Sequence, residues 1–182
     1  MTERQRCAWA MTHELMTSYH DDEWGVPQHD DQKLFEMLNL EGAQSGLSWL
    51  TILKKRDAYR KAFDGFNAKK IAKYDDTKRA ELLQDASIIR NRLKINAFIE
   101  NAKIYLAMQK QHGSFDAYIW QFTNKGKPYT RRQTVASQAA SLAMSKHLKK
   151  DGFRFMGPTV CYAFMQATGM INDHEKGCFK AP

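Results

Sequence analysis

Apolar residues recur at intervals of three and four along most of this chain, which is the period of a helix that buries one face. The clearest run lies between residues 94 and 110. Its apolar face is formed by Ile95, Phe98, Ile99, Ala102, Tyr105 and Leu106. A run of this length and regularity predicts a long amphipathic helix.

Start and stop signals divide the rest of the chain into further helices. Asp30 or Asp31 caps a helix that is interrupted at Gly42, and Pro158 suits the first turn of a last helix that ends at Gly169. The other predicted helices cover residues 48–63, 77–86 and the stretch from a cap at Ser137 to Gly152.

Strand signals are poor, because alternating β-branched runs bounded by turns are missing. The polar and basic stretch 123–134 predicts a loop, and residues 1–30 look irregular and acidic. The sequence therefore predicts an all-α fold in which residues 1–182 form a single domain, as one body or in two lobes.

The length of 182 residues and the apolar fraction of 43% suit one packed domain. No apolar run approaches a membrane span of roughly 18 residues, and the first residues lead into no apolar signal region. We therefore expect a cytoplasmic protein without membrane association. The 3 cysteines are too few for a disulfide framework and favour metal or redox chemistry.

Charge is distributed unevenly along the chain. Residues 1–50 hold 3 basic and 9 acidic residues, a net charge of −6, whereas residues 51–182 hold 25 basic and 11 acidic residues, a net charge of +14. A basic region of that size favours a polyanionic partner through phosphate contacts. The alternative is a solvated surface on a basic protein.

Cysteine and histidine pairs stand near both ends of the sequence. Cys7 and His20 form one pair, and His174 and Cys178 form the other. Two thiolates and two imidazoles are a common ligand set for a tetrahedral structural zinc ion. Spacing alone leaves a second interpretation open, in which the two pairs are unrelated. Cys161 lies in an apolar helical run and is expected to be a small buried hydrophobe.

Two segments, 19–27 and 40–50, combine large aromatic residues with carboxylates and glycines. Aromatic faces and a carboxylate make a plausible purine pocket, since the base stacks and the carboxylate accepts from an exocyclic amine. Glu41 follows the apolar Leu38 and Leu40, so we expect it to be partly buried. The alternative is that the aromatic residues are core and that Glu41 points to water.

Several segments together carry a family resemblance. They are Cys7–Trp9, Tyr19–Pro27, Leu34–Met37, Leu40–Trp49, Leu53–Arg56, Ile88–Arg92, Gly152–Gly157 and Asn172–Cys178. The most specific patterns are Leu-Glu-Gly followed by Leu-Ser-Trp at residues 40–49, and Asn-Asp-His-x3-Cys at residues 172–178. In this order the segments resemble the type I 3-methyladenine DNA glycosylases, from about Cys7 to Cys178.

The resemblance implies the helical fold of the helix-hairpin-helix DNA glycosylase superfamily. It implies one structural Zn²⁺ held by Cys7, His20, His174 and Cys178, which joins the two terminal segments. The implied reaction is monofunctional hydrolysis of the N-glycosidic bond of N3-methyladenine in alkylated DNA, a step of base excision repair. The implied partner is double-stranded DNA containing alkylated bases, and we expect a monomer that associates with the nucleoid when it is bound to DNA.

The same resemblance assigns residues to the site. Glu41 is the base-recognising and catalytic carboxylate, and Tyr19, Trp49 and Trp9 supply the base-binding aromatic surface. A hairpin at residues 154–159, with the helix that follows it, would hold a DNA phosphate through backbone N–H groups.

Two departures from the superfamily pattern stand out. Its hairpins often read Gly-hydrophobic-Gly, whereas this chain has Phe155 in the first position, and Asn172 occupies the slot of the usual water-activating Asp. Two functions from other classes remain: a non-enzymatic zinc-stabilised DNA-binding module, and a metal-dependent nuclease. A complete Cys2His2 shell argues against the nuclease, because it leaves no open metal position.

Overall fold

The computed structural model describes residues 4–130 and 134–182 of the chain. In this part the regular structure is helical, with isolated β-bridges and no longer strand, which confirms the predicted all-α class. The α-helices are α1 (Glu14–Asp22), α2 (Asp31–Gln44), α3 (Trp49–Ala62), α4 (Ala68–Ile71), α5 (Asp76–Gln84), α6 (Arg92–His112), α7 (Phe115–Trp120), α8 (Val135–Lys150) and α9 (Pro158–Ala167). Two short 3-10 helices are η1 (Ala8–Thr12) and η2 (Asp64–Phe66). Over the described ranges, no helix is both long and apolar enough to cross a membrane.

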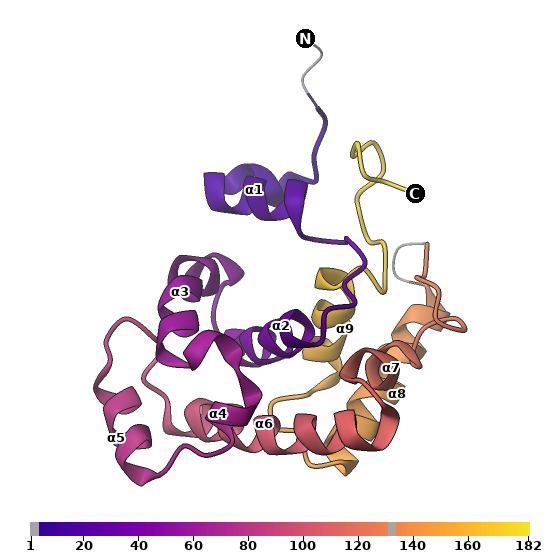
Figure 1. Cartoon of the computed structure of the whole chain (residues 1–182). Coiled ribbons are helices and arrows are strands. Elements are labelled where there is room, and N and C mark those ends of the chain that lie inside the picture. Colours follow the sequence, from indigo (N-terminus) through magenta and orange to yellow (C-terminus); the bar gives the residue numbers. More distant parts are fainter. Residues whose placement is uncertain (1–3, 131–133) are drawn as a thin grey trace.

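Helix α2 lies in the middle of the helical assembly and packs against α3, α6, α7 and α9 (Figure 1). Its residues Leu34, Phe35 and Leu38 are fully buried. The predicted apolar face of α6 faces the same core, and Ile99 and Phe98 are almost inaccessible to water. Burying each such side chain contributes about 1.5–3 kcal/mol to folding. The apolar positions that predicted these central helices are therefore the ones that stabilise them.

Side-chain caps start most of the predicted helices. The carboxylate of Asp30 accepts from the N–H of Lys33, and the hydroxyl of Ser48 accepts from the N–H of Thr51. The start predicted at Ser137 is displaced. Helix α8 begins at Val135, and its cap is the hydroxyl of Thr134, which accepts from the Ser137 N–H. Within the predicted loop 123–134, residues 123–130 form no helix, and residues 131–133 lie outside the described part.

The prediction that residues 1–30 are irregular was wrong. They contain η1 and the helix α1, whose N-cap is the imidazole of His13. Helix α1 packs against η1 and α3, and it buries Tyr19 and His20. Its sequence is polar on average, so tertiary contacts rather than intrinsic periodicity stabilise it.

Helix α2 also continues through Gly42, where an interruption was predicted, and ends at Gln44. The hairpin between α8 and α9 explains this glycine. A Cβ atom at Gly42 would stand 3.3 Å from the Cβ of Phe155 and 3.4 Å from the Cε of Met156. The absent side chain therefore allows the hairpin to pack directly on α2.

The hairpin completes its turn without the first glycine of the superfamily pattern. Phe155 adopts the left-handed conformation with φ of 58°, which costs a non-glycine residue about 1–2 kcal/mol. Asn101 of α6 holds the turn, because its Oδ1 accepts from the Arg154 N–H at 2.8 Å. The Ser145 hydroxyl donates to the Met156 carbonyl at 2.7 Å. These hydrogen bonds offset the backbone strain.

Candidate active site

A cluster of four cysteine and histidine side chains that could hold a metal ion joins the two terminal segments of the chain. The ligand atoms of Cys7, His20, His174 and Cys178 all lie within 4.8 Å of one another, and all four residues are buried. The His174 Nδ1 is 3.2 Å from the His20 Nε2 and 3.5 Å from the Cys178 Sγ. Tetrahedral bonds of zinc length would place such ligands roughly 3.3–3.8 Å apart. The four predicted residues therefore meet at one point, and several of their ligand atoms have the separations expected around a single ion.

Neighbouring groups orient these ligands. The Nδ1 of His20 lies 2.8 Å from Asp21 Oδ1, which leaves Nε2 as the ligand atom, and Asp21 is itself held by Arg6. The N–H of Glu175 donates to the Cys7 Sγ at 3.2 Å. Burial, together with the nearby His20, lowers the pKa of His174 to about 4, so this imidazole is neutral at pH 7, the form that binds a metal.

The two segments that carry the cluster run together at one end of the molecule (Figure 1). The Phe179 N–H donates to the Gln5 carbonyl at 2.8 Å, and the Ala8 N–H donates to the Glu175 carboxylate. Gly25 approaches closely as well, since a Cβ there would stand 2.7 Å from the His174 Nε2. The cluster is therefore part of a larger contact between the N-terminal and C-terminal segments.

A cavity of about 280 Å³ lies beside this junction. It is lined by Trp9, Met16, Tyr19, Trp24, Glu41, Gln44, Trp49, Ala163 and Gln166. All four predicted pocket residues, Glu41, Tyr19, Trp49 and Trp9, are among them. The volume is near the lower end of the range for small-molecule sites, about 300 Å³, and suits one flat ring system.

Two polar atoms in this cavity are buried without a hydrogen-bond partner among the described residues: the hydroxyl of Tyr19 and the Nε1 of Trp49. Their rings lie 5.3 Å apart. Buried polar groups are normally satisfied, and an exception calls for an explanation such as a ligand. The two atoms therefore offer hydrogen bonds to a molecule that enters the cavity.

Glu41 lies in the last turns of α2 and is 4% exposed. Burial raises the pKa of its carboxyl to about 8, because the ionised form loses its hydration. No hydrogen bond from another described residue reaches this side chain. Glu41 is therefore predominantly protonated at pH 7 in the ligand-free protein, and a positive charge beside it would favour its ionised form.

This burial predicts a pH dependence of stability. The folded pKa of about 8 lies above the usual glutamate pKa of 4.5, so the folded state binds more protons between these values and stability falls as pH rises through that window. The free energy of unfolding should fall by about 1.4 kcal/mol per pH unit between about pH 5 and 7.5, relative to the Glu41→Gln variant. Urea unfolding of both proteins at several pH values measures this difference. Parallel curves for the two proteins would contradict it.

Sequence reasoning did not assign a role to Trp24, Gln44 or Gln166, although all three line the cavity. Trp24 stands inside the aromatic segment 19–27, and Gln44 follows Glu41 by almost one helical turn, so periodicity could have placed Gln44 on the same face. Gln166 comes from α9, and no local pattern connects it with the other pocket residues.

A buried lysine holds the turn that carries the pocket. The Nζ of Lys94 donates to the carbonyls of Ala43 and Ser45, at 2.7 Å each, and the residue is 8% exposed. These carbonyls end α2 and lack partners within the helix, and the helix dipole favours a cation there. Lys94 therefore fixes the connection between Glu41 and Trp49.

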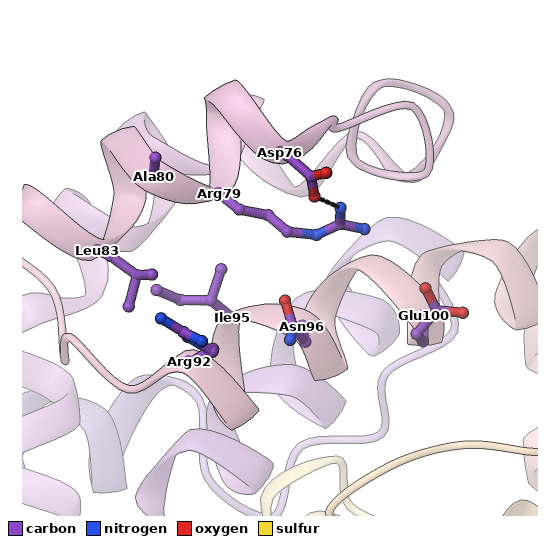
Figure 2. Close-up of a pocket in the computed structure, with 8 residues that line it drawn as sticks. All are labelled: Asp76, Arg79, Ala80, Leu83, Arg92, Ile95, Asn96 and Glu100. Atoms are coloured by element: carbon purple, nitrogen blue, oxygen red, sulfur yellow. Dashed lines mark hydrogen bonds and ion pairs between the residues drawn. The ribbon is translucent and has the colours of Figure 1, made fainter.

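A larger cavity of about 500 Å³ lies between α5 and α6 (Figure 2). On the α5 side Arg79 forms an ion pair with Asp76 and Leu83 adds apolar surface, and on the α6 side lie Arg92 and Ile95. None of the predicted site residues lines this cavity.

Comparison with known proteins shows to which family the chain is similar. The family model for methyladenine glycosylase matches residues 9–181. DNA-3-methyladenine glycosylase 1 of Escherichia coli (strain K12) is 48% identical over 178 residues, which cover 96% of this chain and 95% of the relative. A crystal structure of a 3-methyladenine DNA glycosylase I superposes with a TM-score of 0.91 at 47% identity, over 98% of this chain and 100% of that one. A variant of such an enzyme, crystallised in complex with 3-methyladenine, superposes with a TM-score of 0.90 at 35% identity, over 97% of each chain.

The chain is thus an all-helical enzyme of the hydrolases that act on N-glycosyl bonds. Within them, it belongs to the methyladenine glycosylase family.

Proposed function

We propose that this protein hydrolyses the N-glycosidic bond of N3-methyladenine in alkylated double-stranded DNA and leaves an abasic site. The observation that carries the proposal is the buried Glu41 carboxyl in a cavity walled by Tyr19, Trp49 and Trp9. The relatives named for this activity and the related complex with 3-methyladenine support it.

The chemistry of the lesion accounts for the composition of the cavity. Methylation at N3 makes the base cationic, and the base departs neutral when the glycosidic bond breaks. Aromatic faces attract a cation by about 0.5–2 kcal/mol more than a neutral ring. Extrusion from the duplex costs a few kcal/mol and is cheaper for a damaged base. The site therefore has mainly to extract the damaged base, to select it and to exclude water from it. Strong acid–base catalysis is less necessary.

Glu41 is the proposed catalytic residue. A cationic base at Trp49 and Tyr19 would favour loss of the Glu41 proton, whereas a neutral base would leave the buried carboxyl protonated. The ionised carboxylate then accepts a hydrogen bond from the exocyclic amino group of adenine and stabilises positive charge on the sugar as the bond breaks. Among the cavity-lining residues of the described chain, Glu41 is the one carboxylate, so we also propose that it activates the attacking water through a bound water molecule.

The cluster of Cys7, His20, His174 and Cys178 is proposed to hold one structural Zn²⁺. Its thiolate and imidazole donors and their spacing support this ion. A shell filled by four protein ligands keeps no position for water, so the metal would stabilise the fold rather than take part in hydrolysis. By joining the N-terminal and C-terminal segments, it would hold Trp9 and Tyr19 against α2.

DNA is proposed to lie across the entrance to the cavity. The start of α9 carries no side-chain cap, so its first N–H groups are available to a phosphate, whereas the Arg154 N–H of the hairpin is already held by Asn101. Residues 51–182, with a net charge of +14, supply the basic surface. We propose that the protein acts as a monomer and a single domain, in the cytoplasm and on the nucleoid when it is bound to DNA.

Release of free bases tests the proposal. The protein is incubated with DNA treated with a methylating agent, and the released bases are separated by chromatography. We expect 3-methyladenine as the main product and intact strands with abasic sites. Tight binding without base release would instead indicate a non-enzymatic DNA-binding module, and direct strand cleavage would indicate a nuclease.

A further inference from the structure

The glutamine that α9 contributes to the cavity is held by a buried carboxylate outside it. The Nε2 of Gln166 donates to the Oδ2 of Asp173 at 2.8 Å, and the hydroxyl of Tyr162 donates to the same oxygen at 2.9 Å. Asp173 is 3% exposed. The contact lies between the end of α9 and the segment that carries His174, so both partners sit on well-packed backbone.

This contact determines the orientation of the amide. The Asp173 carboxylate oxygen is an acceptor, so the Gln166 amide must present its NH2 group to it. The amide carbonyl in that position would face another acceptor. The Oε1 of Gln166 is then on the remaining side, and it accepts no hydrogen bond from the described residues. Gln166 also lines the same cavity as Glu41.

We infer that Gln166 is a specificity-determining residue of the base pocket, positioned by Asp173 so that its carbonyl oxygen faces the cavity and accepts a hydrogen bond from the exocyclic amino group of the base. This inference rests on the proposed function. The adenine amino group has two N–H donors, so Glu41 and Gln166 can each receive one.

Two hydrogen-bond acceptors at this position distinguish bases by their hydrogen-bonding groups rather than by the shape of the ring. A guanine base presents a carbonyl oxygen in place of the adenine amino group, and that oxygen would face Gln166 without a hydrogen between them. A site built to bond a substrate N–H disfavours an analogue that lacks it, because its own polar groups stay unpaired. The cavity would therefore reject 3-methylguanine, although its ring is similarly methylated and cationic.

The test compares the two lesions in duplexes of the same sequence. We expect Gln166→Met, which keeps the length and removes the acceptor, to lower the ratio of kcat/KM for 3-methyladenine over 3-methylguanine by at least about tenfold. Gln166→Ala provides a second variant if the first folds poorly. Gln84→Met, at an exposed position at the end of α5, is the matched control and should keep the wild-type ratio.

Asp173→Asn tests the positioning role. Its side chain can present an NH2 group that lets the Gln166 amide turn over, so the ratio should fall in the same direction by at least about threefold. Metal content and thermal stability are measured for each variant. If Asp173, which precedes His174, had a purely structural role, its replacement would change these two properties but not the base preference. An unchanged ratio in both Gln166 variants, in a wild type that does release 3-methyladenine, would overturn the inference and leave the proposed function standing. A wild type that releases no base would refute the proposed function itself.

Discussion

Replacing Cys178 with serine is expected to lower the free energy of unfolding by several kcal/mol and to reduce the bound zinc below one ion per chain. Cys7 and Cys178 close a loop of more than 150 residues, and the loop-entropy model values such a link at roughly 4–5 kcal/mol. Loss of a ligand bond adds to this cost. Urea unfolding and elemental analysis of the purified proteins measure both effects.

Cys161 provides the matched control for this variant. It is buried in α9 but lies outside the metal cluster, so Cys161→Ala should keep full zinc content while losing about 1 kcal/mol of packing. The assignment fails if the wild type holds no stoichiometric zinc, or if zinc stays bound after all four cluster residues have been replaced.

The Glu41→Gln variant is expected to release 3-methyladenine at least about tenfold more slowly in single-turnover assays, which corresponds to roughly 1.4 kcal/mol. Glutamine keeps the shape of the side chain but cannot take the negative charge that favours a cationic base and the positive charge that develops on the sugar as the base departs. Zinc content and affinity for DNA with an abasic site should stay near the wild-type values, because neither uses this carboxyl.

Glu36→Gln on the same helix is the control for the loss of one negative charge, since Glu36 pairs with Arg60 and does not line the cavity. We expect its rate of base release to stay close to that of the wild type. Equal rates for Glu41→Gln and the wild type would reduce Glu41 to a structural role, and the aromatic residues would then have to provide the selectivity.

The helices that the sequence predicted well are those whose burial is regular. Phe98 and Ile99 of α6 and Leu34 of α2 recur at helical spacing because each helix turns one face to a common core. Helix α1 escaped detection because much of its buried surface faces α3 and the C-terminal segment, which are distant in sequence. Its buried Tyr19 and His20 face η1, α3 and the C-terminal segment, and local periodicity carries no signal of such contacts.

The residues of the candidate site likewise differ in how far the sequence could predict them. Residue chemistry indicated the Cys/His cluster and Glu41. Cysteine and histidine are common zinc ligands, and a carboxylate that follows an apolar helix face can be buried. Spacing alone could not decide whether Cys7 and His174 meet, and the resemblance raised that possibility to a prediction. Gln166 and Lys94 were not predicted, since an isolated glutamine or lysine gains its role only from the backbone atoms and side chains that folding brings to it.

The junction of the two terminal segments also sets the order in which the molecule can be completed during synthesis. Helices α2, α3 and α6 all end before residue 113, so the contacts among them can form while the ribosome is still translating the rest of the core. Trp9 and Tyr19 are made early, yet the segment that secures them, with His174 and Cys178, emerges more than 150 residues later. In a nascent chain the aromatic residues proposed to bind the base are therefore held through α1 and α3 but not by the C-terminal segment, and the cavity is completed only after that segment has been made. A nascent chain that has not yet reached this segment is thus a partly packed scaffold without a finished pocket.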